Sequence, residues 1–131
     1  MSRFAALGTS LATGLLVLTA TTWAADEEGA HPYTLWGLVG EGWAALVMLA
    51  FVAGTALTTY WLFLAEPPAR IGHLVMVFVS LTTAVWVLVV EQVPPEEYDS
   101  APGRWLTLLG ALALAGVHGF RAEELNRRGT E

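Results

Sequence analysis

Four stretches of this 131-residue chain are almost free of charged side chains and long enough, or nearly so, to cross a bilayer as helices. They cover about residues 4–24, 43–64, 70–93 and 105–120. The hydrocarbon core of a bilayer is roughly 30 Å thick and takes about 20 residues of helix. An ordinary soluble domain carries about 25% charged residues, whereas this chain carries 14%. The sequence therefore predicts an all-α polytopic membrane protein, a single integral-membrane domain folded as a four-helix transmembrane bundle.

Prolines and glycines mark the limits of the spans. Residues 34–42 contain three glycines and are predicted to form an interfacial lead-in to the second span. A Pro-Pro pair ends this span at Pro67 and another ends the third at Pro94, because proline lacks the N–H that a helix interior requires. The fourth span is the shortest, and residues 121–131 are expected to form a cytoplasmic tail into which the helix can extend.

The first stretch also fits a secretory signal peptide. Arg3 gives it a basic start, an apolar segment follows, and residues 22–24 resemble a cleavage site. Cleavage would leave three helices with an external N-terminus. The small residues Gly8, Ala12 and Ala20 favour a retained helix, because they allow a neighbouring helix to approach closely.

The arginines predict the orientation in the membrane. Every basic residue is Arg, and this Lys-free composition favours a prokaryotic source. With four spans, one side holds five of the six arginines: Arg3, Arg70, Arg121, Arg127 and Arg128. Only Arg104 falls on the other side, so the positive-inside rule places both termini in the cytoplasm of a prokaryotic inner or plasma membrane.

Composition excludes several classes of function. The chain has no Cys, which removes disulfides, thiolate metal sites and cysteine nucleophiles. A net charge of −6 argues against binding nucleic acid, which requires clustered basic residues. No HExxH, GxSxG or Walker motif is present, so we expect a protein that is not an enzyme.

The most specific pattern is a mirrored pair of histidines and arginines. Arg70 precedes His73 by three residues at the start of the third span, and Arg121 follows His118 by three at the end of the fourth. Consecutive antiparallel helices place both histidines at one depth. Two imidazoles can hold a b-type haem whose propionates meet the arginines. Alternatively, the histidines bond to water or nearby polar groups, and the arginines only obey the positive-inside rule.

A second candidate site is a polar seam. His73, Ser80 and Glu91 share one face of the third span, and Glu41 lies at the external end of the second. Glu41 shares its stripe with three further residues: Met48, Thr55 and Thr59. Two carboxylates at matched depth can pass protons or bind a cation. Alternatively, both acids reach water and the hydroxyls bond to carbonyls of the preceding turn.

Small residues recur in the second and fourth spans, where they allow helices to pack backbone to backbone. They are Gly54, Ala56, Gly110, Ala111, Ala113, Ala115 and Gly116. The favoured function is a small accessory or anchor subunit of a larger prokaryotic membrane complex, with energy conversion as the favoured setting. Besides the lipid bilayer, the expected partners are other membrane subunits or further copies of the chain.

Two other functions remain open. One is an electron-transport anchor for haem or a quinone that uses His73 and His118. The other is a small oligomeric channel, holin or ion carrier that uses Glu41 and Glu91.

Overall fold

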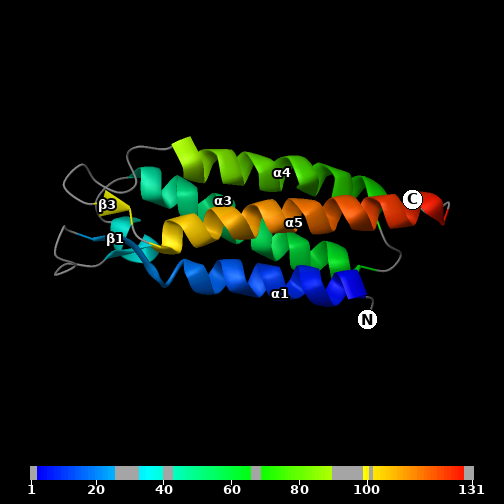
Figure 1. The fold of residues 1–131 in the computed structure, drawn as a ribbon, viewed down its shortest axis with the longest axis horizontal. Coiled ribbons are helices and arrows are strands. Elements are labelled where there is room, and N and C mark those ends of the chain that lie inside the picture. Colours follow the sequence, from blue (N-terminus) through cyan, green and yellow to red (C-terminus); the bar gives the residue numbers. More distant parts are fainter. Residues whose placement is uncertain are drawn as a thin grey trace.

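The chain folds as an antiparallel helical bundle (Figure 1). A computed structural model describes residues 3–25, 33–39, 43–65, 69–89, 99–100 and 102–128. Its main helices are α1 (Arg3–Leu18), α3 (Trp43–Leu64), α4 (Arg70–Val89) and α5 (Pro102–Arg127). Of the described helices, α3, α4 and α5 are long and apolar enough to cross a membrane, and α1 is a shorter apolar helix. The all-α membrane fold predicted from the sequence is confirmed.

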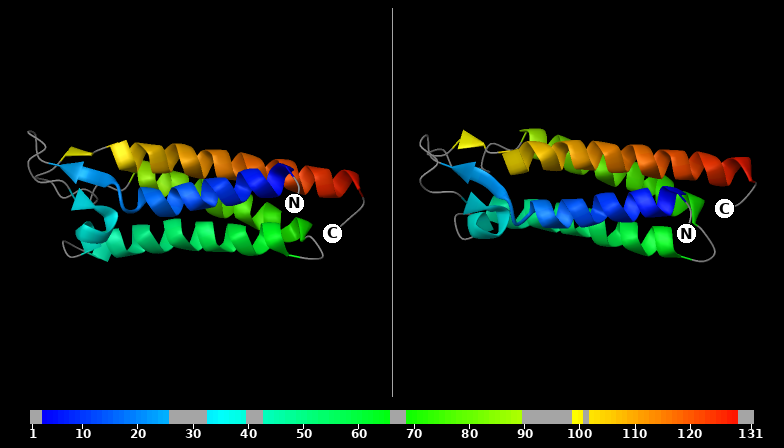
Figure 2. Two further views of the ribbon diagram at one scale, coloured as in Figure 1. Left: turned by 90° about the horizontal axis from the view of Figure 1, so that it is seen from below. Right: turned by 60° about the horizontal axis from the view of Figure 1, so that its bottom comes forward.

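The helices form a ring in which α1 lies against α3 and α5, and α4 lies against α5 and α3. Figure 2 shows the described ends of the chain at one end of the bundle. This end holds the basic residues that the sequence assigned to one side: Arg3, Arg70, Arg121, Arg127 and Arg128. Arg104 lies in the first turn of α5, at the opposite end.

The second to fourth helices follow the predicted spans with different accuracy. Helix α3 has the predicted bounds, and the short helix α2 (Leu35–Leu38) occupies the predicted lead-in. The predicted end of the third span, at residue 93, lies outside the described residues. Helix α5 is longer than the predicted 105–120 at both ends. Proline at the start of α5 has a fixed φ that suits a first turn, and Arg127 pairs with Glu123 one turn earlier near its end.

Helix α1 ends at Leu18, so the prediction of a helix to residue 24 was wrong. Its 16 residues span about 24 Å, less than the roughly 30 Å of a hydrocarbon core. The hydroxyls of Thr19 and Thr21 donate to the carbonyl oxygens of Leu16 and Leu18 at 2.6 and 2.7 Å. The backbone N–H groups of the same two threonines also donate to these carbonyls, in the i→i−3 pattern of the tighter turn that often ends an α-helix.

A small antiparallel sheet closes the end of the bundle opposite the described chain ends (Figure 1). Strand β1 (Thr22–Ala25) lies between β2 (Tyr33–Thr34) and β3 (Asp99–Ser100). Its pairing with β2 is irregular between Thr22 and Ala24, whereas Ala24 and Ala25 pair with β3. The sheet therefore joins the segment after α1 to the segment before α5. The sequence did not predict these short strands.

Trp23 lies inside this end of the bundle rather than at the membrane surface. Its side chain is fully buried and its indole N–H donates to the Leu18 carbonyl at 2.8 Å. The apolar residues around it include Leu35 and Met48. Four other tryptophans are exposed, as amphipathic rings at a headgroup region would be: Trp36, Trp43, Trp61 and Trp105.

Glycines set the spacing between the helices. A Cβ on Gly110 would lie 2.8 Å from the Leu15 side chain of α1, and one on Gly72 would lie 2.5 Å from Leu62 of α3. Both distances are shorter than a normal contact between non-bonded carbon atoms, about 3.5–4.0 Å. Ala56, Ala111 and Ala115 are buried in the bundle, so part of the predicted small-residue set packs the helices together.

Candidate functional site

His73 of α4 and His118 of α5 meet inside the bundle. Their Nδ1 atoms are 2.9 Å apart, and the side chains are 1% and 0% exposed. The two helices run in opposite directions, so the start of one and the late turns of the other lie at one depth, as the sequence predicted. An ionisable pair in this position is a functional candidate by default, because buried polar groups are costly within a membrane.

Two threonines of α3 extend the polar contacts of the histidines along this helix. His118 Nε2 lies 3.0 Å from Thr59 Oγ1, which donates to the Thr55 carbonyl oxygen at 2.7 Å. Thr55 Oγ1 in turn lies 3.1 Å from Thr83 Oγ1 of α4. The network therefore connects α3, α4 and α5, and it includes two threonines from the stripe that the sequence assigned to Glu41.

The network fixes the hydrogen positions of a neutral histidine pair. The Thr59 hydroxyl donates its one hydrogen to the Thr55 carbonyl oxygen, so its oxygen must accept a hydrogen from His118 Nε2. His118 Nδ1 is then a bare acceptor, and it receives the Nδ1–H of His73. His73 Nε2 is left with a lone pair and no hydrogen.

Phe63 covers both imidazoles from α3. Its ring centroid is 4.7 Å from that of His73 and 5.0 Å from that of His118. On its other side, the Phe63 ring lies against Gly8 of α1, where a Cβ would overlap it. All four main helices therefore contribute to the surroundings of the pair, although α1 does so only by leaving room for Phe63.

The side-chain polar atoms that are buried without a hydrogen-bond partner in the described part of the chain all belong to α4. They are Arg70 Nε, His73 Nε2, Ser80 Oγ and Trp86 Nε1. In folded proteins the great majority of buried polar atoms are hydrogen-bonded. Among the described helices, α4 therefore differs in having buried polar atoms without hydrogen-bond partners, and His73 Nε2 is one of them.

A b-type haem does not fit between the two histidines as they are placed. An imidazole nitrogen lies about 2 Å from a transition metal that it binds, so an iron ion between two rings holds them apart. Here the two Nδ1 atoms are hydrogen-bonded to each other, and the ring centroids are 5.1 Å apart. Arg121 pairs with Glu124 instead of pointing to a ligand between the rings. The geometry gives no support to haem or to electron transport.

The proposed carboxylate seam is only partly visible. Glu41 and Glu91 lie outside the described residues. Ser80 is fully buried midway along α4 and shares the inner side of this helix with His73. Within the described ranges, no group of three or more His, Asp or Glu residues could hold a metal ion.

Arg104 is a buried cation. The sequence identified it only as the one arginine on the external side of the membrane. It is 6% exposed, its Nε donates to the Val87 carbonyl at 2.9 Å, and its guanidinium lies 5.2 Å from the Trp105 ring centre. Its position at the start of an apolar helix was the available signal. Together with the histidines, it gives the bundle interior a polar group near each end.

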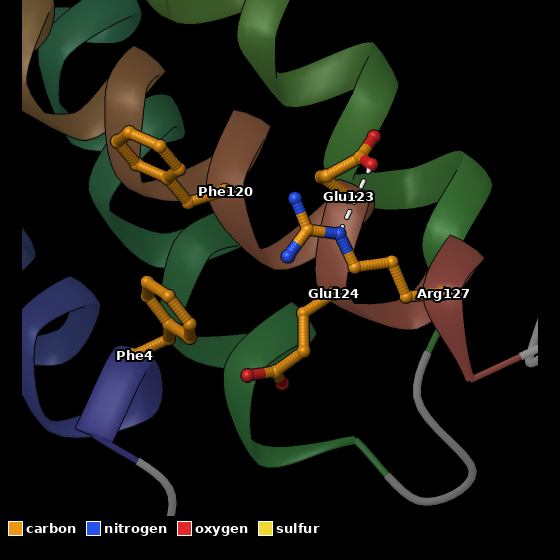
Figure 3. Close-up of a pocket in the computed structure, with 5 residues that line it drawn as sticks. All are labelled: Phe4, Phe120, Glu123, Glu124 and Arg127. Atoms are coloured by element: carbon orange, nitrogen blue, oxygen red, sulfur yellow. Dashed lines mark hydrogen bonds and ion pairs between the residues drawn. The ribbon is translucent and has the colours of Figure 1, made fainter.

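A small pocket of about 150 Å³ lies at the end of the bundle that holds the described chain ends (Figure 3). Phe4 and Phe120 stack across it with centroids 6.4 Å apart. Its charged rim is paired within α5, because Arg127 Nε lies 3.3 Å from Glu123 and Glu124 bonds to Arg121. We interpret this pocket as a surface feature of the bundle end.

No protein-family model, curated protein or solved structure matches this chain.

Replacing Thr59 with valine is expected to lower the free energy of unfolding by about 1 kcal/mol, because His118 Nε2–H loses its acceptor while the side-chain volume stays nearly the same. Denaturation with sodium dodecyl sulfate in mixed micelles measures this loss. Thr58→Val on the exposed side of α3 is the matched control. Equal stability of the two variants would show that the Thr59 bond contributes nothing.

Proposed function

We propose that this protein is a small, non-catalytic accessory or anchor subunit of a larger prokaryotic membrane complex. The protein is a small polytopic membrane protein, and three of its described helices are long and apolar enough to cross a membrane. One observation carries the proposal: two helix glycines, Gly54 of α3 and Gly116 of α5, are exposed and have open space where a side chain would be.

These two glycines differ from those that the bundle uses. At Gly72 and Gly110, an added Cβ would come within 3 Å of a neighbouring helix, so the absence of a side chain has an internal reason. At Gly54 and Gly116, an added Cβ meets nothing within 4 Å. Glycine weakens a helix interior by about 1 kcal/mol relative to alanine. A helix from outside the bundle would give both positions a packing role.

One groove lies about one turn before Gly54, and a second groove is lined by Gly116. Exposed Ala50 lies one turn before Gly54, in the small-xxx-small spacing that brings membrane helices close together, and lines a shallow groove of about 290 Å³. Gly116 and Gly119 line a second groove of about 320 Å³ on α5. A partner's transmembrane helices fit such grooves better than flexible lipid tails do, because close packing drives association within the membrane.

We also infer that the end carrying the described chain ends faces the cytoplasm. Five of the six arginines lie at this end, and the positive-inside rule places such an end in the cytoplasm. The polar network of His118 and Thr59 then acts inside the subunit, where it links three helices and keeps the outer faces in register.

Replacing Gly54 or Gly116 with leucine is expected to release the partner subunits without unfolding the bundle. The new side chain occupies the partner's position, whereas in the described part of the chain its Cβ meets no atom within 4 Å beyond the adjoining residues and backbone of its own helix. Native mass spectrometry of the mildly solubilised complex, isolated through a tag on this chain, measures the partner's retention. We expect at least about a tenfold loss, corresponding to about 1.4 kcal/mol of association free energy.

Ser10→Leu is the matched control, because Ser10 is exposed on α1 and the change in bulk is similar. The control is expected to retain the partner. A wild-type chain that is isolated from its native membrane alone, or only as copies of itself, would overturn the proposed function.

A further inference from the structure

We propose that water enters the bundle at the end where α1 begins and α5 ends. From there it follows one side of α4 as far as Ser80. Along this path the water hydrogen-bonds to Arg70 Nε, His73 Nε2 and Ser80 Oγ, which have no hydrogen-bond partner among the described residues. The site is a narrow hydrated inlet, and its ligand is a chain of water molecules.

The first argument is the cost of leaving these atoms without partners. His73 and Ser80 are 1% and 0% exposed, so neither ring nor hydroxyl reaches bulk solvent. An unpaired polar group in an apolar environment costs about 1–3 kcal/mol. The hydrogen pattern of the network leaves His73 Nε2 as an acceptor, which a water O–H satisfies.

Ser80 differs from the threonines of the same bundle. Thr55, Thr59 and Thr83 each donate a hydroxyl hydrogen to the carbonyl oxygen four residues earlier, at 2.7–2.9 Å. This is the usual way for a hydroxyl to be satisfied within a helix. The Ser80 hydroxyl makes no such bond and remains available to a ligand from outside the helix.

The three residues lie in order along one side of α4. His73 follows Arg70 by about one turn, and Ser80 follows His73 by seven residues, which is close to two turns and about 10 Å. A hydrogen bond spans about 2.8 Å between oxygens, so several water molecules are needed between His73 and Ser80. Met76 lies between them and is buried. Its flexible side chain can move aside more easily than a branched one.

The charges near the inlet favour neutral water over a cation. Arg70 begins the helix one turn before His73, and Arg121 follows His118 by three residues on α5. The nearest described carboxylates along α5 are those of Glu123 and Glu124, and they already pair with Arg127 and Arg121. On α3, the groups that contact the rings are the apolar ring of Phe63 and the hydroxyl of Thr59, and neither is charged. Metal ions and other cations are therefore repelled at the mouth.

The absence of cysteine makes a labelling test possible in an otherwise unreactive chain. A thiol reacts with a hydrophilic methanethiosulfonate reagent only where water reaches it, because the thiolate is the nucleophile. In sealed proteoliposomes, Ser80→Cys is expected to be labelled at least about tenfold faster than Ala111→Cys. Ala111 is the control because it lies seven residues from His118, at the depth of Ser80, and is fully buried.

Labelling is expected from the side that carries the described chain ends and not from the other side. Equal rates for Ser80→Cys and Ala111→Cys, or faster labelling from the sheet side, would overturn the inlet. Ala84→Cys, one turn further along α4 and also buried, is expected to stay unlabelled because the inlet stops at Ser80.

A measurement on the unaltered protein guards against a misfolded variant. Solid-state nuclear magnetic resonance of chains with ¹⁵N-histidine in bilayers detects magnetisation transferred from water to the ring nitrogens. We expect transfer to His73 Nε2, with His73→Gln used to assign the signal. Rings of His73 and His118 that receive no magnetisation from water would refute the proposal, and this result is independent of any partner subunit.

Discussion

Replacement of His118 with leucine is expected to lower the free energy of unfolding by about 2–4 kcal/mol, the largest loss at any polar position of the bundle. His118 is the centre of the network, because it accepts from His73 and donates to Thr59. Leucine has a similar volume but offers neither bond. The variant therefore leaves the Nδ1–H of His73 without an acceptor, and it removes one of the two hydrogen bonds of the Thr59 hydroxyl, which still donates to the Thr55 carbonyl.

Replacement of His73 with leucine is expected to cost half as much or less. It leaves only His118 Nδ1 without a partner, because His118 keeps its bond to Thr59. It also removes His73 Nε2, which has no protein partner in the described structure. The asymmetry follows from the direction of the hydrogen bonds and not from burial, since both side chains are almost fully buried.

A double-mutant cycle measures these differences. We expect the variant with both leucines to lose less stability than the sum of the single variants, because neither imidazole then remains without its partner. Denaturation in mixed micelles gives each free energy. Equal losses for the two single variants, or a larger loss for His73→Leu, would contradict the assigned direction of the network.

The sequence was sufficient for the features that depend on local pattern. The bounds of α3 and the start of α4 follow from apolar runs and from the prolines that separate them. The mirrored histidines could be placed at one depth because consecutive helices in a membrane run antiparallel. The contact of Thr59 with His118 could not be predicted in this way, because it joins α3 to α5. Which diagonal neighbours touch depends on the packing of all four helices.

The features that the sequence missed have specific physical causes. Helix α1 ends early in a tighter turn, in which the N–H groups of residues 19–21 donate to carbonyls three residues earlier, an effect that apolar composition does not reveal. Trp23 is buried because β1 turns inward over the end of the bundle, and strands of two to four residues leave no periodic pattern. The haem hypothesis required space for an iron ion between the two rings, but the rings are hydrogen-bonded to each other.

Gly8 of α1 couples the outer packing of the bundle to the histidine pair. The Phe63 ring lies between this glycine and both imidazoles, so its position depends on all three residues. A side chain at position 8 must push Phe63 towards the histidines or push α1 away from α3. Either displacement disturbs a close-packed interior, in which overpacking costs about 1–3 kcal/mol.

Gly8→Leu is therefore expected to lower the free energy of unfolding by about 2–3 kcal/mol and to shift the ring resonances of His73 and His118. Gly14→Leu is the matched control, since it lies on the same helix and an added Cβ there meets nothing within 4 Å. The control is expected to change stability by less than about 1 kcal/mol, because leucine is a better helix former than glycine. It should also leave the histidine resonances in place. If both variants shift these resonances equally, Phe63 does not transmit the position of α1 to the pair.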